Sequence, residues 1–361
     1  MTQAVVVSQF GGVSPSWRNR IINGAMMISQ RNGTSSITPS SGFTYSLDRW
    51  QYGADVGSKV SIQQNAGSVT PPIGFTKYLG ITSLSAYTAG STEQYNIEQK
   101  IEGFNIADLG FGTANAKTVT LSFWVYSSLT GSFSGSLLNS DGTRSYPFSY
   151  TISSANTWTQ ASVTIAGDTT GTWNTDNSQG MCVYFNLGCG STFLGTAGAW
   201  TGSEKHGVTG SVSVVGTNGA TWYITGVQLE VGSTATAFEW RPYGMELQLC
   251  QRYYQYWGGE ANYGYFGGTA SNISTTASFL PIIFVVPMRS APSFTYVGAL
   301  SAFDLRATNN ASHTPTALAQ DQTTSKVFGL WITTSGLTAN TPGQMIGANS
   351  TAGQICFSAE L

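Results

Sequence analysis

The chain has 361 residues, of which 41% are hydrophobic and only 9% are charged, with 43 glycines and a formal net charge of −2. Disorder requires low hydrophobicity and high charge, so this composition argues against a disordered chain. The small net charge and the lack of a basic run argue against a nucleic-acid partner. The composition instead indicates extended β-structure with a surface of Ser, Thr, Asn and Gln, in two or three domains.

Residues 1–23 form the first candidate segment. They contain an apolar cluster, Ala4–Val7, and two breaks, at Gly11-Gly12 and Ser14-Pro15. One interpretation is a flexible tail. The one that we favour is an N-terminal anchoring arm that adds to another subunit's sheet or surface. The segment lacks the charged start and long apolar core of a signal peptide, so we expect no export signal.

Residues 24–242 contain strand-like runs separated by turn signals, with no helical pattern between them. Thr118–Tyr126 is the clearest run, because every second residue from Val119 to Val125 is apolar, and in the last run Gly226 marks a slip in the alternation. The runs are Lys59–Gln64, Lys77–Ser83, Tyr95–Glu102, Thr118–Tyr126, Gly131–Leu138, Tyr146–Ile152, Trp158–Ile165, Met181–Leu187 and Thr221–Val231. This pattern predicts an all-β, antiparallel sandwich of two sheets.

The spacing of apolar residues changes after Arg241-Pro242, from every second position to every third or fourth. The change predicts a short α-helix over residues 243–258, ended by Gly258-Gly259, between two β-domains. Apolar residues lie on more than one face of this helix, so a single sheet surface cannot cover all of them. We therefore predict an interfacial helix in a homotrimer. The candidate interface residues are Met245, Leu249, Tyr253 and Tyr256.

Residues 259–361 are predicted to form a smaller C-terminal β tip domain. Its strand-like runs are Tyr263–Phe266, Ser278–Val286, Ser293–Val297, Lys326–Thr333 and Gln354–Glu360. The segment Tyr253–Phe266 is rich in aromatic rings beside Asn and Gln, the residue types that stack on sugars and bond their hydroxyls. The candidate glycan-binding residues are Trp257, Tyr263, Tyr265 and, on a Gly-rich loop, Trp173. The alternative is that these rings pack the helix onto the second domain or a neighbouring subunit.

Motifs for catalysis are missing from the sequence. The two histidines, His206 and His313, lie in separate predicted loops, and no nucleophile-elbow, phosphate-loop or zinc-protease spacing occurs. Glycosidase chemistry requires two opposed carboxylates. The candidate pairs are Glu98 with Glu102, Glu230 with Glu239, and Asp168 with Asp176. Such pairs also arise by chance, and the first is better interpreted as a polar stripe on one strand. We expect no enzyme activity and no cofactor.

Three smaller features complete the sequence reading. Asp168 and Asp176 are weak calcium candidates, although turn formation explains them equally well. The four cysteines are interpreted as free thiols, with a Cys182–Cys189 bridge as the alternative. Asp48-Arg49-Trp50 is interpreted as a buried charge pair under a large aromatic ring. The most apolar window, Phe279–Met288, is too short to span a bilayer, so we expect no membrane insertion.

Several segments, in order along the chain, resemble one family of proteins. The segments are RNRIINGAMMISQRNGTS (Arg18–Ser35), YSLDRW (Tyr45–Trp50), YNIEQKIEG (Tyr95–Gly103), TVTLSFWVYSS (Thr118–Ser128), GTWNTDNSQG (Gly171–Gly180), VQLEVGSTATAFEWRPYGMELQLCQRYY (Val227–Tyr254) and QICFSAEL (Gln354–Leu361). They look like those of bacteriophage tail-fibre and receptor-binding proteins that carry a carbohydrate-binding-module-like jelly roll. The resemblance covers roughly residues 18–254, and residues 258–353 match nothing in that family.

The resemblance implies a structural protein of the virion that attaches to the host by non-catalytic binding of cell-surface polysaccharide or lipopolysaccharide. It implies a jelly-roll sandwich at residues 24–242, and an N-terminal arm that contacts other virion proteins. It supplies no catalytic residue. The alternatives are a capsid-decorating head fibre of the same fold and a glycan depolymerase.

Overall fold

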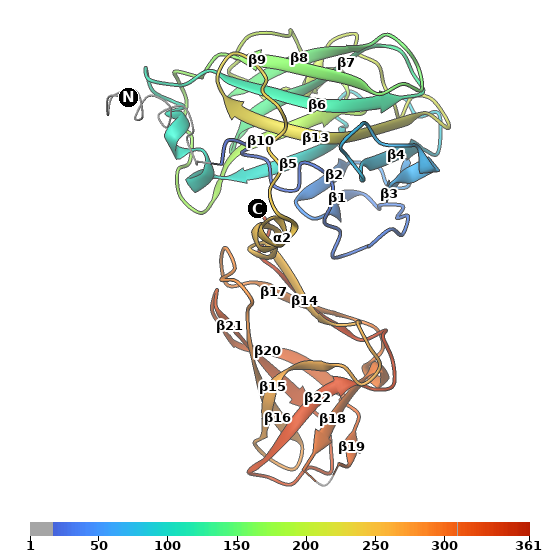
Figure 1. Ribbon diagram of the computed structural model, residues 1–361, viewed down its shortest axis with the longest axis vertical. Coiled ribbons are helices and arrows are strands. Elements are labelled where there is room, and N and C mark those ends of the chain that lie inside the picture. The colour runs from blue at the N-terminus through green and yellow to red at the C-terminus, as the bar shows by residue number, and fades with distance from the viewer. Residues whose placement is uncertain (1–16, 309) are drawn as a thin grey trace, which may run out of the picture. The chain divides into compact units, whose positions relative to one another are not determined.

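The computed structural model describes residues 17–308 and 310–361 (Figure 1). The chain divides into two compact units, each drawn from discontinuous segments. Unit 1 comprises the described residues up to Met27, with Ser36–Thr44 and Tyr52–Arg241. Unit 2 comprises Ile28–Ser35, Tyr45–Gln51 and Pro242–Leu361. Most of the predicted arm, residues 1–23, lies outside the described residues.

Unit 1 is an antiparallel β-sandwich, as predicted. One sheet has the strand order β1-β2-β5-β10-β7-β8, in which β1 and β2 each include residues of Tyr45–Gln51 that are assigned to unit 2, and the other has the order β3-β4-β13-β6-β9. The strands are β1 (Gly42–Leu47), β2 (Trp50–Ala54), β3 (Val60–Gln64), β4 (Leu79–Ser83), β5 (Tyr95–Glu102), β6 (Val119–Ser127), β7 (Gly131–Asn139), β8 (Ser145–Ile152), β9 (Thr159–Ile165), β10 (Gln179–Asn186) and β13 (Thr221–Val231). A short parallel pair, β11 (Leu194–Gly195) and β12 (Gly207–Val208), forms a separate small sheet. All the runs predicted for this part of the chain are strands.

The alternation of apolar residues explains how the sandwich core forms. In β6, Val119, Leu121 and Phe123 are almost fully buried. In β13, the register against β6 shifts between Thr225 and Gln228, where Gly226 has a φ of 64°. A Cβ on Gly226 would lie 2.7 Å from the Phe75 ring. Glycine therefore permits both the bulge and the change of phase that the sequence indicated.

Residues 18–23 are tied to β13 by hydrogen bonds within unit 1. The Asn19 side chain donates to the Val227 carbonyl at 3.0 Å and accepts from the Leu229 amide at 3.0 Å. The Glu239 carboxylate accepts from the Arg18 and Asn19 amides at 2.9 and 3.0 Å. The described end of the predicted arm is thus part of the sandwich unit.

The single α-helix of the described residues, α2, is shorter than predicted. It spans Tyr243–Gln251, and residues 254–258 form strand β14 (Tyr254–Gly258), which pairs antiparallel with β23 (Gln354–Ser358). The prediction was wrong because the aromatic residues from 253 to 257 happen to continue a helical spacing. Aromatic residues favour strands, and pairing with β23 decides the outcome. Within the described residues, no helix is long enough to cross a bilayer.

Unit 2 has two further antiparallel sheets. The larger has the order β19-β18-β22-β15-β16-β21-β20, and the smaller has the order β14-β23-β17. The remaining strands are β15 (Tyr265–Asn272), β16 (Ala277–Ile283), β17 (Ser293–Val297), β18 (Phe303–Ala307), β19 (Ser312–His313), β20 (Ala317–Thr323), β21 (Val327–Thr333) and β22 (Thr341–Gly347). Short 3-10 turns lie at Ala66–Ser68, Gly103–Asn105, Ala107–Leu109, Ser191–Phe193 and Leu300–Ala302.

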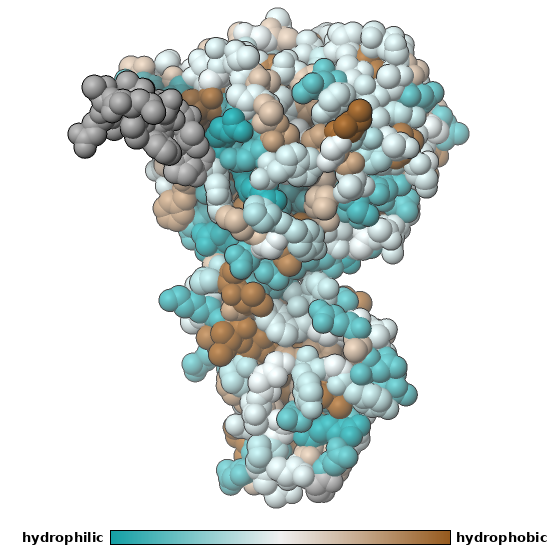
Figure 2. Space-filling model, in the orientation of Figure 1, coloured by the Kyte–Doolittle hydropathy of each residue, from teal (hydrophilic) through white to brown (hydrophobic). Residues whose placement is uncertain are grey.

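The core of unit 2 is apolar and rich in aromatic rings. Phe266, Phe303 and Phe328 pack there with Ile355 and Phe357 of β23. The outer surfaces carry few charges. Figure 2 shows that much of the visible face is pale, the colour of residues of intermediate hydropathy, as expected for a surface rich in Ser, Thr and Gly.

A buried ionic cluster in unit 2 joins its N-terminal segments to the C-terminus. The Arg49 side chain is 1% exposed, forms an ion pair with Glu360 and lies 3.6 Å from the Tyr253 ring centre. Asp48 accepts from the Gln30 side chain at 2.7 Å and lies 3.8 Å from Arg31. The predicted burial of both charges is confirmed, and Glu360 is a partner of Arg49 that the local sequence did not indicate.

All four cysteines are free thiols, as interpreted from the sequence, so the alternative Cys182–Cys189 bridge is wrong.

Candidate functional site

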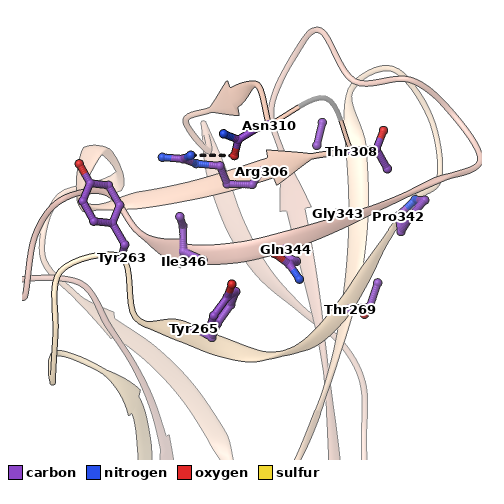
Figure 3. Close-up of a pocket in the computed structure, with 11 residues that line it drawn as sticks. Tyr263, Tyr265, Thr269, Arg306, Thr308, Asn310, Pro342, Gly343, Gln344 and Ile346 are labelled. Carbon is purple, nitrogen blue, oxygen red and sulfur yellow. Dashed lines mark hydrogen bonds between the residues drawn. The ribbon is translucent and has the colours of Figure 1, made fainter.

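The candidate site is a pocket of about 810 Å³ on unit 2, a size typical of small-ligand sites. It lies along β15, β18 and β22 (Figure 3). The lining residues are Tyr263, Tyr265, Thr269, Arg306, Ala307, Thr308, Asn310, Pro342, Gly343, Gln344 and Ile346. Their strand neighbours Phe266, Leu305 and Met345 are buried in the core. Alternation along each strand thus leaves the pocket residues on the outer face.

Two exposed tyrosines form one side of the pocket. Tyr263 is 49% exposed and Tyr265 is 64% exposed. Tyr263 has a φ of 60° in the turn that precedes β15, where the Gly264 amide donates to the Ala261 carbonyl. Between Tyr265 and Thr269 the register against β22 shifts. The bulge separates the tyrosines from the regular part of the strand and leaves both rings accessible.

Arg306 is held in a fixed position beside the tyrosines. Its Nε donates to Asp304 Oδ2 at 2.8 Å, and its Nη1 donates to Asn310 Oδ1 at 2.9 Å. Its guanidinium carbon lies 5.7 Å from the Tyr263 ring centre, and Figure 3 shows the side chain extending toward that ring. A guanidinium fixed by two bonds loses little further freedom when a ligand binds.

Neutral hydrogen-bonding groups complete the lining. Gln344 of β22 pairs in register with Thr269 of β15 on one side and with Arg306 of β18 on the other. An amide both donates and accepts, as does a hydroxyl. The pocket therefore combines accessible aromatic faces with groups that match sugar hydroxyls.

The structure brings two of the four predicted glycan-binding residues, Tyr263 and Tyr265, into this pocket. Trp257 is partly buried and packs against the rings of Phe284 and Phe357, at centroid distances of 5.9 and 5.4 Å. Its ring therefore packs against the core of unit 2, and it does so from strand β14 and not from the predicted helix.

Trp173 lies in unit 1 and is 7% exposed. Its ring packs edge-on against Phe111 at 4.9 Å and Trp200 at 5.5 Å, and its indole nitrogen donates to the Thr170 carbonyl at 3.3 Å. A ring covered in this way offers no face for stacking a sugar. The structure gives Trp173 a packing role instead.

The predicted interface residues differ in exposure. Met245 is 36% exposed, and Leu249 and Tyr256 are partly buried. Tyr253 is 0% exposed and lies under Arg49, so its ring is committed to packing inside the chain. The homotrimer itself stays a prediction.

The weak calcium candidates have other partners. Asp168 accepts two hydrogen bonds from Arg144, at 2.7 and 2.8 Å. Although burial opposes it, Arg144 holds the pKa of Asp168 below its usual value. Asp176 accepts from the Ser178 amide at 2.9 Å, as in a turn. Within the described parts of the chain, no group of three or more His, Cys, Asp or Glu side chains is placed to hold a metal ion.

The other carboxylate pairs are also structural. Glu98 and Glu102 lie on the same strand, β5, and are buried, at 0% and 1% exposure. Burial raises the pKa of Glu98 to about 7. Glu230 accepts from the Gln228 side chain at 2.9 Å inside unit 1, whereas Glu239 binds the amides of residues 18 and 19.

Arg306, Asn310, Gln344 and Thr269 were not predicted from the sequence. A weak signal exists in FDLRA, where Phe303 and Leu305 alternate with Asp304 and Arg306. This alternation is too short to identify a strand by itself. Pocket residues contributed by three separate strands cannot be grouped before the strand order is known.

Comparisons with protein-family models and with curated proteins found no match. Solved structures match at low similarity. The bacteriophage CBA120 tailspike protein 4 enzymatically active domain is 14% identical over 61% of this chain and 22% of that chain, with a TM-score of 0.29. This chain therefore spans about a fifth of that tailspike chain.

Two carbohydrate-binding structures match at a similar level. TmCBM61 in complex with beta-1,4-galactotriose is 9% identical over 60% of this chain and 100% of that chain, with a TM-score of 0.30. A putative sugar binding protein from Bacteroides thetaiotaomicron is 13% identical over 60% and 100% of the two chains, with a TM-score of 0.34. Likeness at this level does not establish a family for this chain.

Proposed function

We propose that the protein is a non-catalytic carbohydrate-binding protein that acts as a bacteriophage tail fibre in host attachment. The observation that carries the binding role is the pocket of unit 2, where Tyr263, Tyr265 and Arg306 converge. Exposed aromatic rings stack on the apolar faces of sugars, and fixed polar groups orient the hydroxyls. Host cell-surface polysaccharide or lipopolysaccharide is the ligand class that fits this role.

Binding without hydrolysis is favoured by the residues of the pocket. None of the described lining residues carries a carboxylate, whereas glycoside hydrolysis commonly uses two. The nearest carboxylate in sequence to Arg306, Asp304, is 4% exposed and accepts three hydrogen bonds from within the chain. A carboxylate used in this way is a poor general acid or nucleophile.

The virion role is supported by the motifs that resemble tail-fibre and receptor-binding proteins. In this role, the N-terminal arm contacts other virion proteins, and the protein is a homotrimer located in the phage tail. Three tips acting together strengthen attachment without any new contact, even where each pocket binds a sugar weakly. Light scattering that gives a monomer at micromolar concentration would contradict the trimer.

The binding role is tested on the full chain with a glycan array that includes bacterial surface polysaccharides. We expect binding to a restricted set, and a loss of about fivefold to thirtyfold in affinity for Tyr265→Ala, since stacking on one ring contributes about 1–2 kcal/mol. Tyr296→Ala is the matched control, because Tyr296 is a 40% exposed tyrosine of unit 2 outside the pocket. Equal glycan affinity of the two variants would show that the pocket is not the binding site.

Two further measurements separate this role from its alternatives. Incubation with each bound polysaccharide should leave its chain length unchanged, and shortening would indicate a depolymerase. Immunogold electron microscopy of virions should label the tail, and labelling of the capsid would indicate a head fibre.

A further inference from the structure

The charge of Arg306 is compensated inside the protein. Among the described residues that line the pocket, Arg306 is the one that carries a charge. Its Nε bonds to Asp304, whose side chain is 5% exposed while that of Arg306 is 28% exposed. The carboxylate is therefore covered by protein and the guanidinium faces the pocket. Together they form a dipole with no net charge.

Asp304 is also held in place by donors other than Arg306. It accepts from the Ser312 hydroxyl at 2.6 Å and from the His313 amide at 3.0 Å. A buried carboxylate that accepts three hydrogen bonds is held in one position. The compensation of Arg306 is thus built into strands β18 and β19 and does not depend on a mobile counterion.

The other polar groups of the pocket are suited to a neutral ligand. Gln344, Thr269 and the two tyrosine hydroxyls present acceptor oxygens as well as donors. An anionic oxygen can use only the donors of these groups, whereas a neutral sugar hydroxyl can use both their donors and their acceptors.

We propose that this pocket selects uncharged sugars over sugars that carry a carboxylate or a phosphate, and that the Asp304–Arg306 pair sets this preference. The inference rests on the proposed glycan-binding function of the same site. Arg306 serves here as a positioned donor to hydroxyls, and Asp304 cancels the attraction that its charge would otherwise exert on acidic glycans.

The experiment uses the full chain and matched pairs of oligosaccharides that differ only by a uronic acid or phosphate group. Affinities are measured by calorimetry at about 50 and about 500 mM NaCl, where exposed charges are weakly and strongly screened. We expect the neutral member to bind at least about fivefold more tightly, with less than about a twofold change between the two salt concentrations.

If the acidic oligosaccharide of a pair binds more tightly than the neutral one, and its affinity falls as the salt concentration rises, the inference is overturned and the glycan-binding role stays intact. Failure of every neutral and acidic member to bind would remove the proposed function, and the inference with it.

The Asp304→Asn variant tests the cause of the preference. It leaves Arg306 uncompensated, so acidic members should gain at least about tenfold in affinity and become salt-dependent. Asp321→Asn is the matched control, because Asp321 is an exposed carboxylate on β20 of the same unit. An unchanged preference in folded Asp304→Asn would overturn the proposal.

Arg306→Gln keeps the test informative if Asp304→Asn does not fold. It removes the cation, so neutral members should lose about tenfold in affinity and acidic members should not gain. A selective loss of acidic members would show that Arg306 is an anion receptor and would overturn the proposal.

Discussion

The buried pair between Arg49 and Glu360 gives the sharpest prediction about stability. Replacing Glu360 by Gln removes the charge opposite a guanidinium that is 1% exposed. Burial opposes ionisation of Arg49, yet Glu360 holds its pKa above the usual value. Arg49 also has a φ of 70°, which is uncommon for a residue other than glycine. The ion pair therefore helps to hold a turn whose backbone is itself unfavourable.

The magnitude follows from the burial of the pair. Removing one partner of a buried ion pair costs about 3–5 kcal/mol, because the remaining charge stays buried without compensation. Two further contacts bear on this cost. The Tyr253 ring still faces Arg49 at 3.6 Å and lowers it, whereas the loss of the second ion pair of Glu360, with Arg31 at 3.1 Å, adds to it. We expect Glu360→Gln to destabilise unit 2 by about 3 kcal/mol.

The assay must report on unit 2 alone, because a chain with two units need not unfold in one step. Hydrogen exchange at the amides of β14 and β23 measures the free energy of opening there. Glu260→Gln is the control, since Glu260 is an exposed glutamate of the same unit, and its effect should stay below about 0.5 kcal/mol. A loss below about 1 kcal/mol for Glu360→Gln would refute the reasoning, because Arg49 would then be compensated elsewhere.

Three further predictions concern unit 1. Burial raises the pKa of Glu98 from 4.5 to about 7, so the stability that Glu98 contributes is present below pH 4.5 and is lost as the pH rises through 7. In urea unfolding, Glu98→Gln should therefore have the same free energy of unfolding as the wild type at low pH and a free energy about 3 kcal/mol higher at pH 8. An equal difference in free energy at both pH values would contradict this. Trp173→Ala should lower the free energy of unfolding by about 3–5 kcal/mol, measured by thermal unfolding, and leave glycan affinity unchanged. A loss of glycan affinity without a loss of stability would instead show that Trp173 stacks on the sugar. Gly226→Ala should cost at least about 1 kcal/mol, because the φ of 64° and the nearby Phe75 ring oppose a Cβ, and a neutral effect would mean that the bulge moves.

The strands of the sandwich could be predicted because their signal is local. In β6, apolar residues at every second position from Val119 to Val125 identify a strand and its buried face. In β13, the change of phase at Gly226 was visible for the same reason. Both signals depend only on neighbouring residues, so neither requires knowledge of the strand order.

Features that depend on distant partners could not be predicted in this way. Glu360 meets Arg49 although 311 positions separate them. The sequence identified Tyr263 and Tyr265 as candidate glycan-binding residues. It also identified Trp257, which only the packing of its ring against Phe357 in the structure excludes. Residue type indicated which side chains suit a sugar, and tertiary packing decided which of them are accessible.

The strands β18 and β22 show why most of the pocket was missed. Gly343, Gln344 and Pro342 interrupt the apolar alternation of β22, and β18 is short. The pocket needs β15, β18 and β22 side by side, an arrangement that pairs residues 265–272 with residues 341–346. A single sequence does not reveal pairing across such separations.

The most direct test of the central claim is a crystal structure of the full chain with an oligosaccharide that it binds on the array. The account predicts a sugar ring in the unit 2 pocket, stacked on Tyr263 or Tyr265 and within hydrogen-bond distance of Arg306. Electron density for the sugar elsewhere on the chain, with this pocket empty, would contradict it.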